Sequence, residues 1–208
     1  GKSVMLELIK EELAEAGVAP SQMISINFED MRYSHLQTAT ALHDEIIKRA
    51  EGIEGKAYLF FDEIQEVEGW EKCVNSLRVA LDCDIYITGS NAKLLSGELA
   101  TYIGGRYVEF VIYPFSFAEF LELYHTIAPS DTIQQCFQKY LLAGGMPYLA
   151  NLRYEEEPSR QYLTDLFNSV QLKDIVKRNK IRDIDLLERI IAYMTANVGT
   201  VFSASSLA

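Results

Sequence analysis

The segment AYLFFDEIQ (residues 57–65) constrains the fold more than any other part of the sequence. Its first residues are apolar without a break, and they run directly into Asp62 and Glu63. A continuous apolar run of this length favours a strand that is covered on both faces, as in the centre of a parallel sheet. Ligands of open parallel sheets bind at the carboxyl ends of the strands, so the two acids are candidate site residues.

Strand-like and helix-like segments alternate on both sides of this run. Further strands are predicted at residues 23–30, 84–91 and 107–112, and helices at residues 4–16, 36–50, 70–81, 92–102 and 116–124. Strands that alternate with amphipathic helices are typical of βαβ units, so the sequence predicts an α/β fold with a parallel sheet. From residue 132 onward the apolar spacing predicts helices at 132–142, 148–152 and 159–179, and a helix pair within 183–208.

Composition narrows the class of protein. The 208 residues are 49% hydrophobic, which supports a sizeable core. No apolar run approaches the roughly 20 residues that span a bilayer, and no secretory signal stands at the N-terminus, so we expect no membrane contact. Cys73, Cys83 and Cys136 are scattered and lack C-x-x-C spacing, which favours the cytoplasm and disfavours a zinc site.

The net charge of -11 makes nucleic acid an unfavourable partner for the surface as a whole. The segment KDIVKRNKIR (residues 173–182) is locally basic. It is consistent with contact to nucleic acid or to a protein partner, and also with a solvated helix end. The sequence begins at the last residues of a phosphate-loop motif and ends inside an amphipathic helical pattern, so we expect it to be truncated at both ends.

The first residues, Gly1, Lys2 and Ser3, match the last positions of a phosphate-binding loop, G-x-x-x-x-G-K-[ST]. On this interpretation, the strand and most of the loop lie upstream of Gly1. Asp62 would then join Ser3 in binding Mg²⁺, because Mg²⁺ prefers hard oxygen ligands and retains several waters. Glu63 would orient the attacking water. The alternative is a strand that ends in two solvated acids.

Two more positions are candidates for the same site. Ser90 and Asn91 end the buried strand predicted at 84–91, where either could hydrogen-bond the attacking water or the γ-phosphate; a helix N-cap is the alternative. Arg106 stands just before the strand predicted at 107–112, where a cation could meet phosphate charge across a subunit boundary. The alternative is an ordinary surface arginine. Contact between Arg106 and phosphate across a subunit boundary would make the protein a homo-oligomer.

The order GKS, FFDEIQ, ITGSN, GGR and YPFSFAEF resembles the AAA-type P-loop ATPases of bacteria and archaea that often carry a C-terminal domain of unknown function with a nuclease-like fold. The resemblance covers about residues 1–150, and more loosely the helices up to residue 208. It implies the end of Walker A at Gly1, Lys2 and Ser3, Walker B at Asp62 and Glu63, sensor 1 at Asn91 with Ser90, and an arginine finger-like residue at Arg106. The turn Gly144-Gly145-Met146-Pro147 matches an element that enters a helical lid. One departure is that G-x-x-x-x does not precede Gly1.

The resemblance implies a P-loop NTPase core at 1–125 and a helical lid at 126–179. By fold analogy alone, the truncated helical segment at 180–208 resembles the start of a winged helix. The expected function is Mg²⁺-dependent ATP hydrolysis coupled to a partner or to a missing C-terminal domain. Three alternatives remain open. They are a nucleotide-gated interaction module with little hydrolysis, a DNA-associated ATPase, and a scaffold that has lost its phosphate loop.

Overall fold

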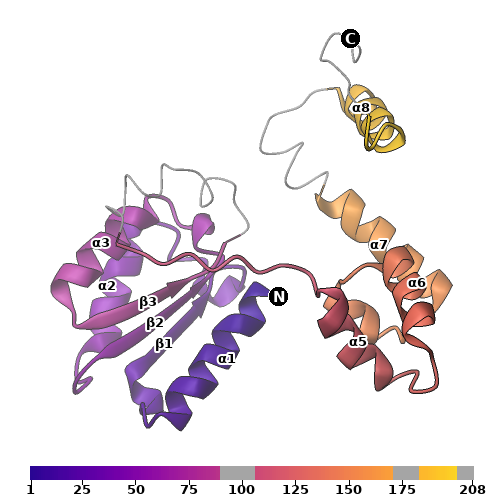
Figure 1. Ribbon diagram of the computed structural model, residues 1–208. Helices are drawn as coiled ribbons and strands as arrows, with labels where there is room; N and C mark the ends of the chain where they lie inside the picture. The colour runs from indigo at the N-terminus through magenta and orange to yellow at the C-terminus, as the bar shows by residue number, and fades with distance from the viewer. Residues whose placement is uncertain (90–105, 171–182, 201–208) are drawn as a thin grey trace. The chain divides into compact units, whose positions relative to one another are not determined.

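The computed structural model describes residues 1–89, 106–170 and 183–200, and it divides into two compact units, Gly1–Tyr113 and Pro114–Ala208 (Figure 1). The sequence placed a boundary after residue 125. In the structure, the helix α5 (Phe117–His125) instead belongs to the second unit.

In the part of the first unit that the structure describes, a parallel three-stranded sheet runs in the order β1-β2-β3. Its strands are β1 (Met23–Asn27), β2 (Ala57–Asp62) and β3 (Cys83–Ile87). The register aligns Ile26 with Phe61 and Phe61 with Ile87. The continuous apolar run therefore forms the central strand, as predicted, and the α/β fold with flanking helices is confirmed.

Alternate residues of β2 face different helices. Leu59 and Phe61 are fully buried in a core formed with α2 (Ala39–Ala50) and α3 (Trp70–Ala80). Phe60 points to the other face, where the ammonium of Lys10 in α1 (Lys2–Glu15) lies 5.8 Å from its ring centroid. Thus α1 covers one face of the sheet, and α2 and α3 cover the other (Figure 1). Short 3-10 turns complete the unit at Pro20–Gln22, Met31–Tyr33 and Ile64–Glu66.

The strand predicted at residues 107–112 is wrong. This segment has no strand structure, and its apolar side chains are exposed: Val108 by 77% and Phe110 by 80%. A strand exists only when a neighbour supplies hydrogen bonds, and the described strands pair only with one another. The helix predicted at 92–102 lies outside the described residues.

The second unit is helical, as predicted. Its elements are α5, α6 (Ile133–Ala143), the 3-10 turn Pro147–Ala150, α7 (Glu156–Val170) and α8 (Ile184–Ala196). Ser116 and Thr132 begin α5 and α6 with reciprocal capping boxes, each satisfying backbone N–H groups at the helix start. Phe120 is fully buried at the centre of an aromatic core.

The Gly144-Gly145 turn is enforced by close packing. The Phe115 N–H donates to the Gly145 carbonyl at 2.7 Å, and a Cβ on Gly145 would lie 2.0 Å from the Phe115 carbonyl oxygen. Glycine is therefore required there for space.

Among the described residues, no helix is long and apolar enough to cross a membrane.

Candidate functional site

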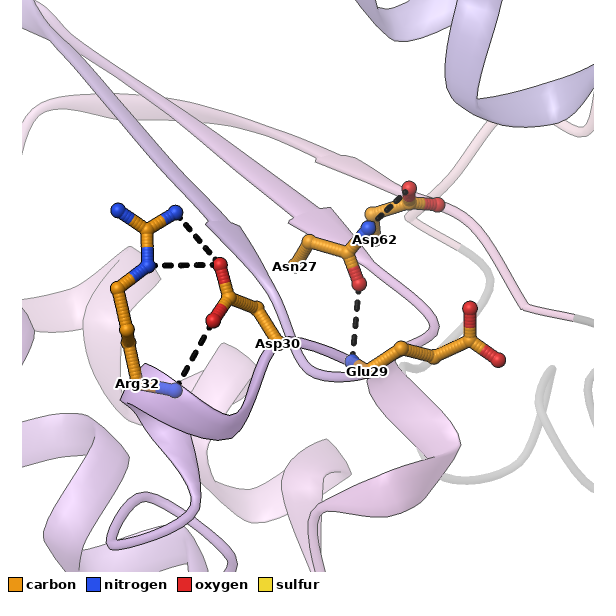
Figure 2. Close-up of polar contacts among 5 residues, drawn as sticks. All are labelled: Asn27, Glu29, Asp30, Arg32 and Asp62. Atoms are coloured by element: carbon orange, nitrogen blue, oxygen red, sulfur yellow. Dashed lines mark hydrogen bonds and ion pairs between the residues drawn. The ribbon is translucent and has the colours of Figure 1, made fainter.

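Polar groups from all three strands meet at the carboxyl edge of the sheet. The register places Asn27, the last residue of β1, opposite Asp62, the last residue of β2. Thr88 follows β3 directly, and its N–H donates to the carbonyl of Phe61 at 2.9 Å. Figure 2 shows Asn27 and Asp62 side by side. This edge is the position expected for a ligand site in a parallel sheet.

Asp62 is only 7% exposed, and its carboxylate is held by two side chains. The Thr88 hydroxyl donates to Oδ1, and the Asn27 amide donates to Oδ2 at 3.3 Å. The side-chain oxygen Oδ1 of Asn27 accepts the Glu29 N–H at 2.9 Å, which turns the Asn27 NH₂ group toward Asp62 (Figure 2). Each carboxylate oxygen can still accept from or coordinate another group, because each has a second lone pair.

Glu63 has an unusual backbone conformation. Its φ of 56° and ψ of 48° lie in the left-handed region, which costs a residue with a Cβ about 1–2 kcal/mol. The Thr88 hydroxyl accepts its N–H at 3.2 Å, and the Gln65 amide donates to its carboxylate. Strained backbone of this kind concentrates at functional sites, where the surrounding structure holds it in place.

Lys2 approaches the same edge from the start of α1. Its ammonium donates to the backbone carbonyl of Gly89 at 2.8 Å, although Lys2 and Gly89 are 87 positions apart in the sequence. Gly89 directly follows Thr88. No side chain caps α1, and no acid stands in its first turn, which also contains the exposed Ser3. The positive end of the helix dipole is therefore available to an anion near Lys2.

An exposed ion pair lies beyond β1. Arg32 contacts Asp30 at 2.5 Å (Figure 2), and hydrogen bonds from the Arg32 side chain and then from its N–H lower the pKa of the Asp30 carboxyl. Both partners are exposed enough for water to screen the pair, so it contributes little to stability. The pair keeps Asp30 directed at Arg32 rather than at Asp62.

The structure therefore brings together Lys2, Asp62 and Glu63 from the sequence-predicted set. Arg106 is exposed, and the strand expected to follow it does not form. Ser90, Asn91 and the basic segment 173–182 lie outside the described residues. The sequence prediction did not assign Asn27, Thr88 or Gln65 to the site.

The donor set fits Mg²⁺ held with a nucleotide rather than by protein alone. Within the described part of the chain, no three His, Cys, Asp or Glu side chains gather into a metal site. Asp62 supplies one oriented carboxylate, and Mg²⁺ is commonly held by one or two carboxylates together with waters and substrate phosphates.

Comparisons with known proteins identify a matching family and two relatives. A family model described as an AAA domain matches residues 1–121, more than half of the chain, and one described as a domain of unknown function matches residues 134–208. An uncharacterized protein of Haemophilus influenzae is 38% identical over 208 residues, which are 100% of this chain and 51% of that protein. Uncharacterized protein MJ1544 of Methanocaldococcus jannaschii is 34% identical over 185 residues, 84% of this chain and 41% of that protein.

The chain thus spans about half the length of the curated relatives it matches. No solved structure matches it significantly.

Proposed function

The chain belongs to the AAA domain family, and on that basis we propose that the protein binds ATP with Mg²⁺ and hydrolyses the γ-phosphate. One observation carries the proposal. Lys2 lies far from the neighbouring acids Asp62 and Glu63 in the sequence, yet all three contact the two residues that follow β3, Thr88 and Gly89. P-loop NTPases use a lysine on the phosphates, an aspartate on Mg²⁺ and a residue that orients the attacking water, and Lys2, Asp62 and Glu63 supply side chains of these kinds.

Each residue has a distinct role in this proposal. Lys2 leaves the Gly89 carbonyl to neutralise phosphate charge, aided by the N-terminus of α1. Asp62 and Ser3 bind Mg²⁺, which supplies charge stabilisation for the transferred phosphoryl group. Glu63 orients the attacking water. Asn91, with Ser90, and Arg106 are proposed to contact the γ-phosphate, Arg106 from a neighbouring subunit.

We further propose that residues N-terminal to Gly1 complete the phosphate-binding loop and supply the strand that leads into α1. The motif is a strand, a loop and a helix, and α1 provides the helix. In the whole protein, nucleotide state would be coupled to the C-terminal part, which we propose includes a nuclease-like domain. The cytoplasm is the proposed compartment.

The test is Glu63→Gln in the full-length protein. We expect ATP affinity to stay within a few fold while turnover falls about 10²- to 10⁴-fold, the usual contribution of a general base. Glu66→Gln is the matched control, because Glu66 is exposed in the same 3-10 turn. It should leave turnover unchanged. Wild-type turnover in Glu63→Gln would refute the assignment.

One observation favours a nucleotide-gated interaction module with little hydrolysis. The Gln65 amide donates to the Glu63 carboxylate, so a protein group takes up part of the hydrogen-bonding capacity of that carboxylate. If this contact persists with ATP bound, the protein will bind nucleotide and turn it over slowly. Gln65→Ala would then raise the turnover rate, whereas in an efficient ATPase it would leave the rate unchanged or lower it.

A further inference from the structure

Thr88 holds the whole turn that follows β2. Its N–H donates to the carbonyl of Phe61 at 2.9 Å, and its own carbonyl accepts the Ile64 N–H at 3.1 Å. Between these backbone bonds, its hydroxyl contacts both Asp62 and Glu63. Thr88 is only 9% exposed, so these bonds form away from bulk water.

The hydroxyl of Thr88 acts on the two acids in different ways. It donates its proton to Oδ1 of Asp62 and accepts the backbone N–H of Glu63 at 3.2 Å. A hydroxyl has one proton to donate, so the bond to Asp62 uses it fully. The side-chain direction of Asp62 and the left-handed backbone of Glu63 therefore depend on the same oxygen atom.

We propose that Thr88 is a positioning residue that aligns the magnesium-binding carboxylate and the water-orienting glutamate with each other. The inference rests on the proposed ATPase function and names a residue that acts through Asp62 and Glu63. Phosphoryl transfer depends mainly on positioning, and a displacement of about 1 Å can cost 10²-fold in rate. The adjoining Gly89 carbonyl receives Lys2, so the same short segment also contacts the phosphate-binding lysine.

The residue type fits this role. The branched Cβ of threonine restricts its χ1 rotamers, so the hydroxyl keeps its direction without further support. Serine offers the same donor and acceptor with more rotamer freedom. Valine has the same shape and offers neither. The Thr88→Ser and Thr88→Val pair therefore separates hydrogen bonding from packing.

The experiment measures ATP turnover and Mg²⁺-dependent ATP binding in the full-length protein. For Thr88→Val we expect kcat to fall about 10- to 100-fold, with a higher Mg²⁺ concentration for half-maximal ATP binding and little change in ATP affinity at saturating Mg²⁺. For Thr88→Ser we expect kcat and the Mg²⁺ concentration for half-maximal ATP binding to stay within about three-fold of wild type. The serine hydroxyl restores the bonds to Asp62 and to the Glu63 N–H.

Thr38→Val is the matched control. Thr38 caps α2 by accepting the Ala41 N–H at 3.3 Å, so its loss also removes a hydroxyl bond to a backbone N–H, but outside the site. It should lower stability and leave kcat and the Mg²⁺ dependence unchanged. Wild-type kcat in Thr88→Val, or equal losses in Thr88→Ser and Thr88→Val, would overturn the positioning role alone. A wild-type protein that neither binds nor hydrolyses ATP with Mg²⁺ would overturn the proposed function as well.

Discussion

The left-handed backbone at Glu63 predicts an inverted response to glycine. At an ordinary position, glycine is less stable than alanine by about 0.5–1 kcal/mol, because it loses more conformational freedom on folding. At Glu63, alanine also carries the left-handed penalty of about 1–2 kcal/mol, which glycine avoids. Glu63→Gly should therefore be more stable than Glu63→Ala by about 0.5–1 kcal/mol.

Glu66 gives the reference for this comparison. It is exposed in the same 3-10 turn and does not have a positive φ. There, Ala should be more stable than Gly by about 0.5–1 kcal/mol. The difference between the two Gly–Ala comparisons, about 1–2 kcal/mol, then measures the backbone strain at Glu63, since effects of glycine on the unfolded chain cancel.

Urea unfolding followed by tryptophan fluorescence is the direct assay. Trp70 is the single tryptophan of the chain, is 6% exposed and lies in the same unit, so its emission reports the unfolding of that unit. The midpoints and slopes give the free energies of unfolding of the four variants. If Ala is more stable than Gly by the same amount at both positions, Glu63 is not strained and the reasoning is refuted.

Two further predictions concern the second unit. Gly145→Ala should destabilise it by about 1–3 kcal/mol, because the new Cβ would meet the Phe115 carbonyl; far-UV circular dichroism of thermal unfolding measures this, and wild-type stability would contradict it. Bonds from the Ser116 N–H and hydroxyl lower the pKa of Glu119 below its ordinary 4.5, so the stability they give is present above that value and is lost as pH falls through the lowered pKa. Glu119→Gln should therefore weaken the acid dependence of unfolding, and an unchanged dependence would contradict this.

Local sequence patterns predicted most of the elements, since each has a local physical cause. The apolar run at residues 57–61 became the central strand because it can be buried on both faces. Helix starts were less accurate. The second helix was expected from residue 36, but it begins at Ala39 after the cap at Thr38, while Leu36 is buried ahead of it.

The site was only partly predictable. Lys2, Asp62 and Glu63 stand in recognisable motifs, whereas Asn27 and Thr88 reach Asp62 only through the register of three strands. The predicted strands at 23–30 and 84–91 extend past both residues, so their positions at the strand ends emerge only from the structure. The backbone of Glu63 has no sequence signal, since glutamate rarely adopts a left-handed conformation.

The missing strand at residues 107–112 follows from the topology of the sheet. The crossovers through α2 and α3 lie on one face and carry the chain from β1 to β3. Such crossovers are right-handed in about 98% of cases, so a crossover through α1, on the opposite face, would run in the opposite direction. A strand that leads through α1 into β1 would therefore lie beyond β3, because β2 already occupies the place beside β1.

That position would explain why residues 107–112 have strand composition but pair with none of the described strands. A strand beside β3 would offer its far edge to them, and their exposed apolar side chains would become buried. Hydrogen exchange at these backbone amides should then be slow in the full-length protein and fast in the chain of residues 1–208. Fast exchange in both would refute this arrangement. Slow exchange in both would mean that the segment pairs without the preceding strand, most simply with the edge of β3 that no described strand occupies.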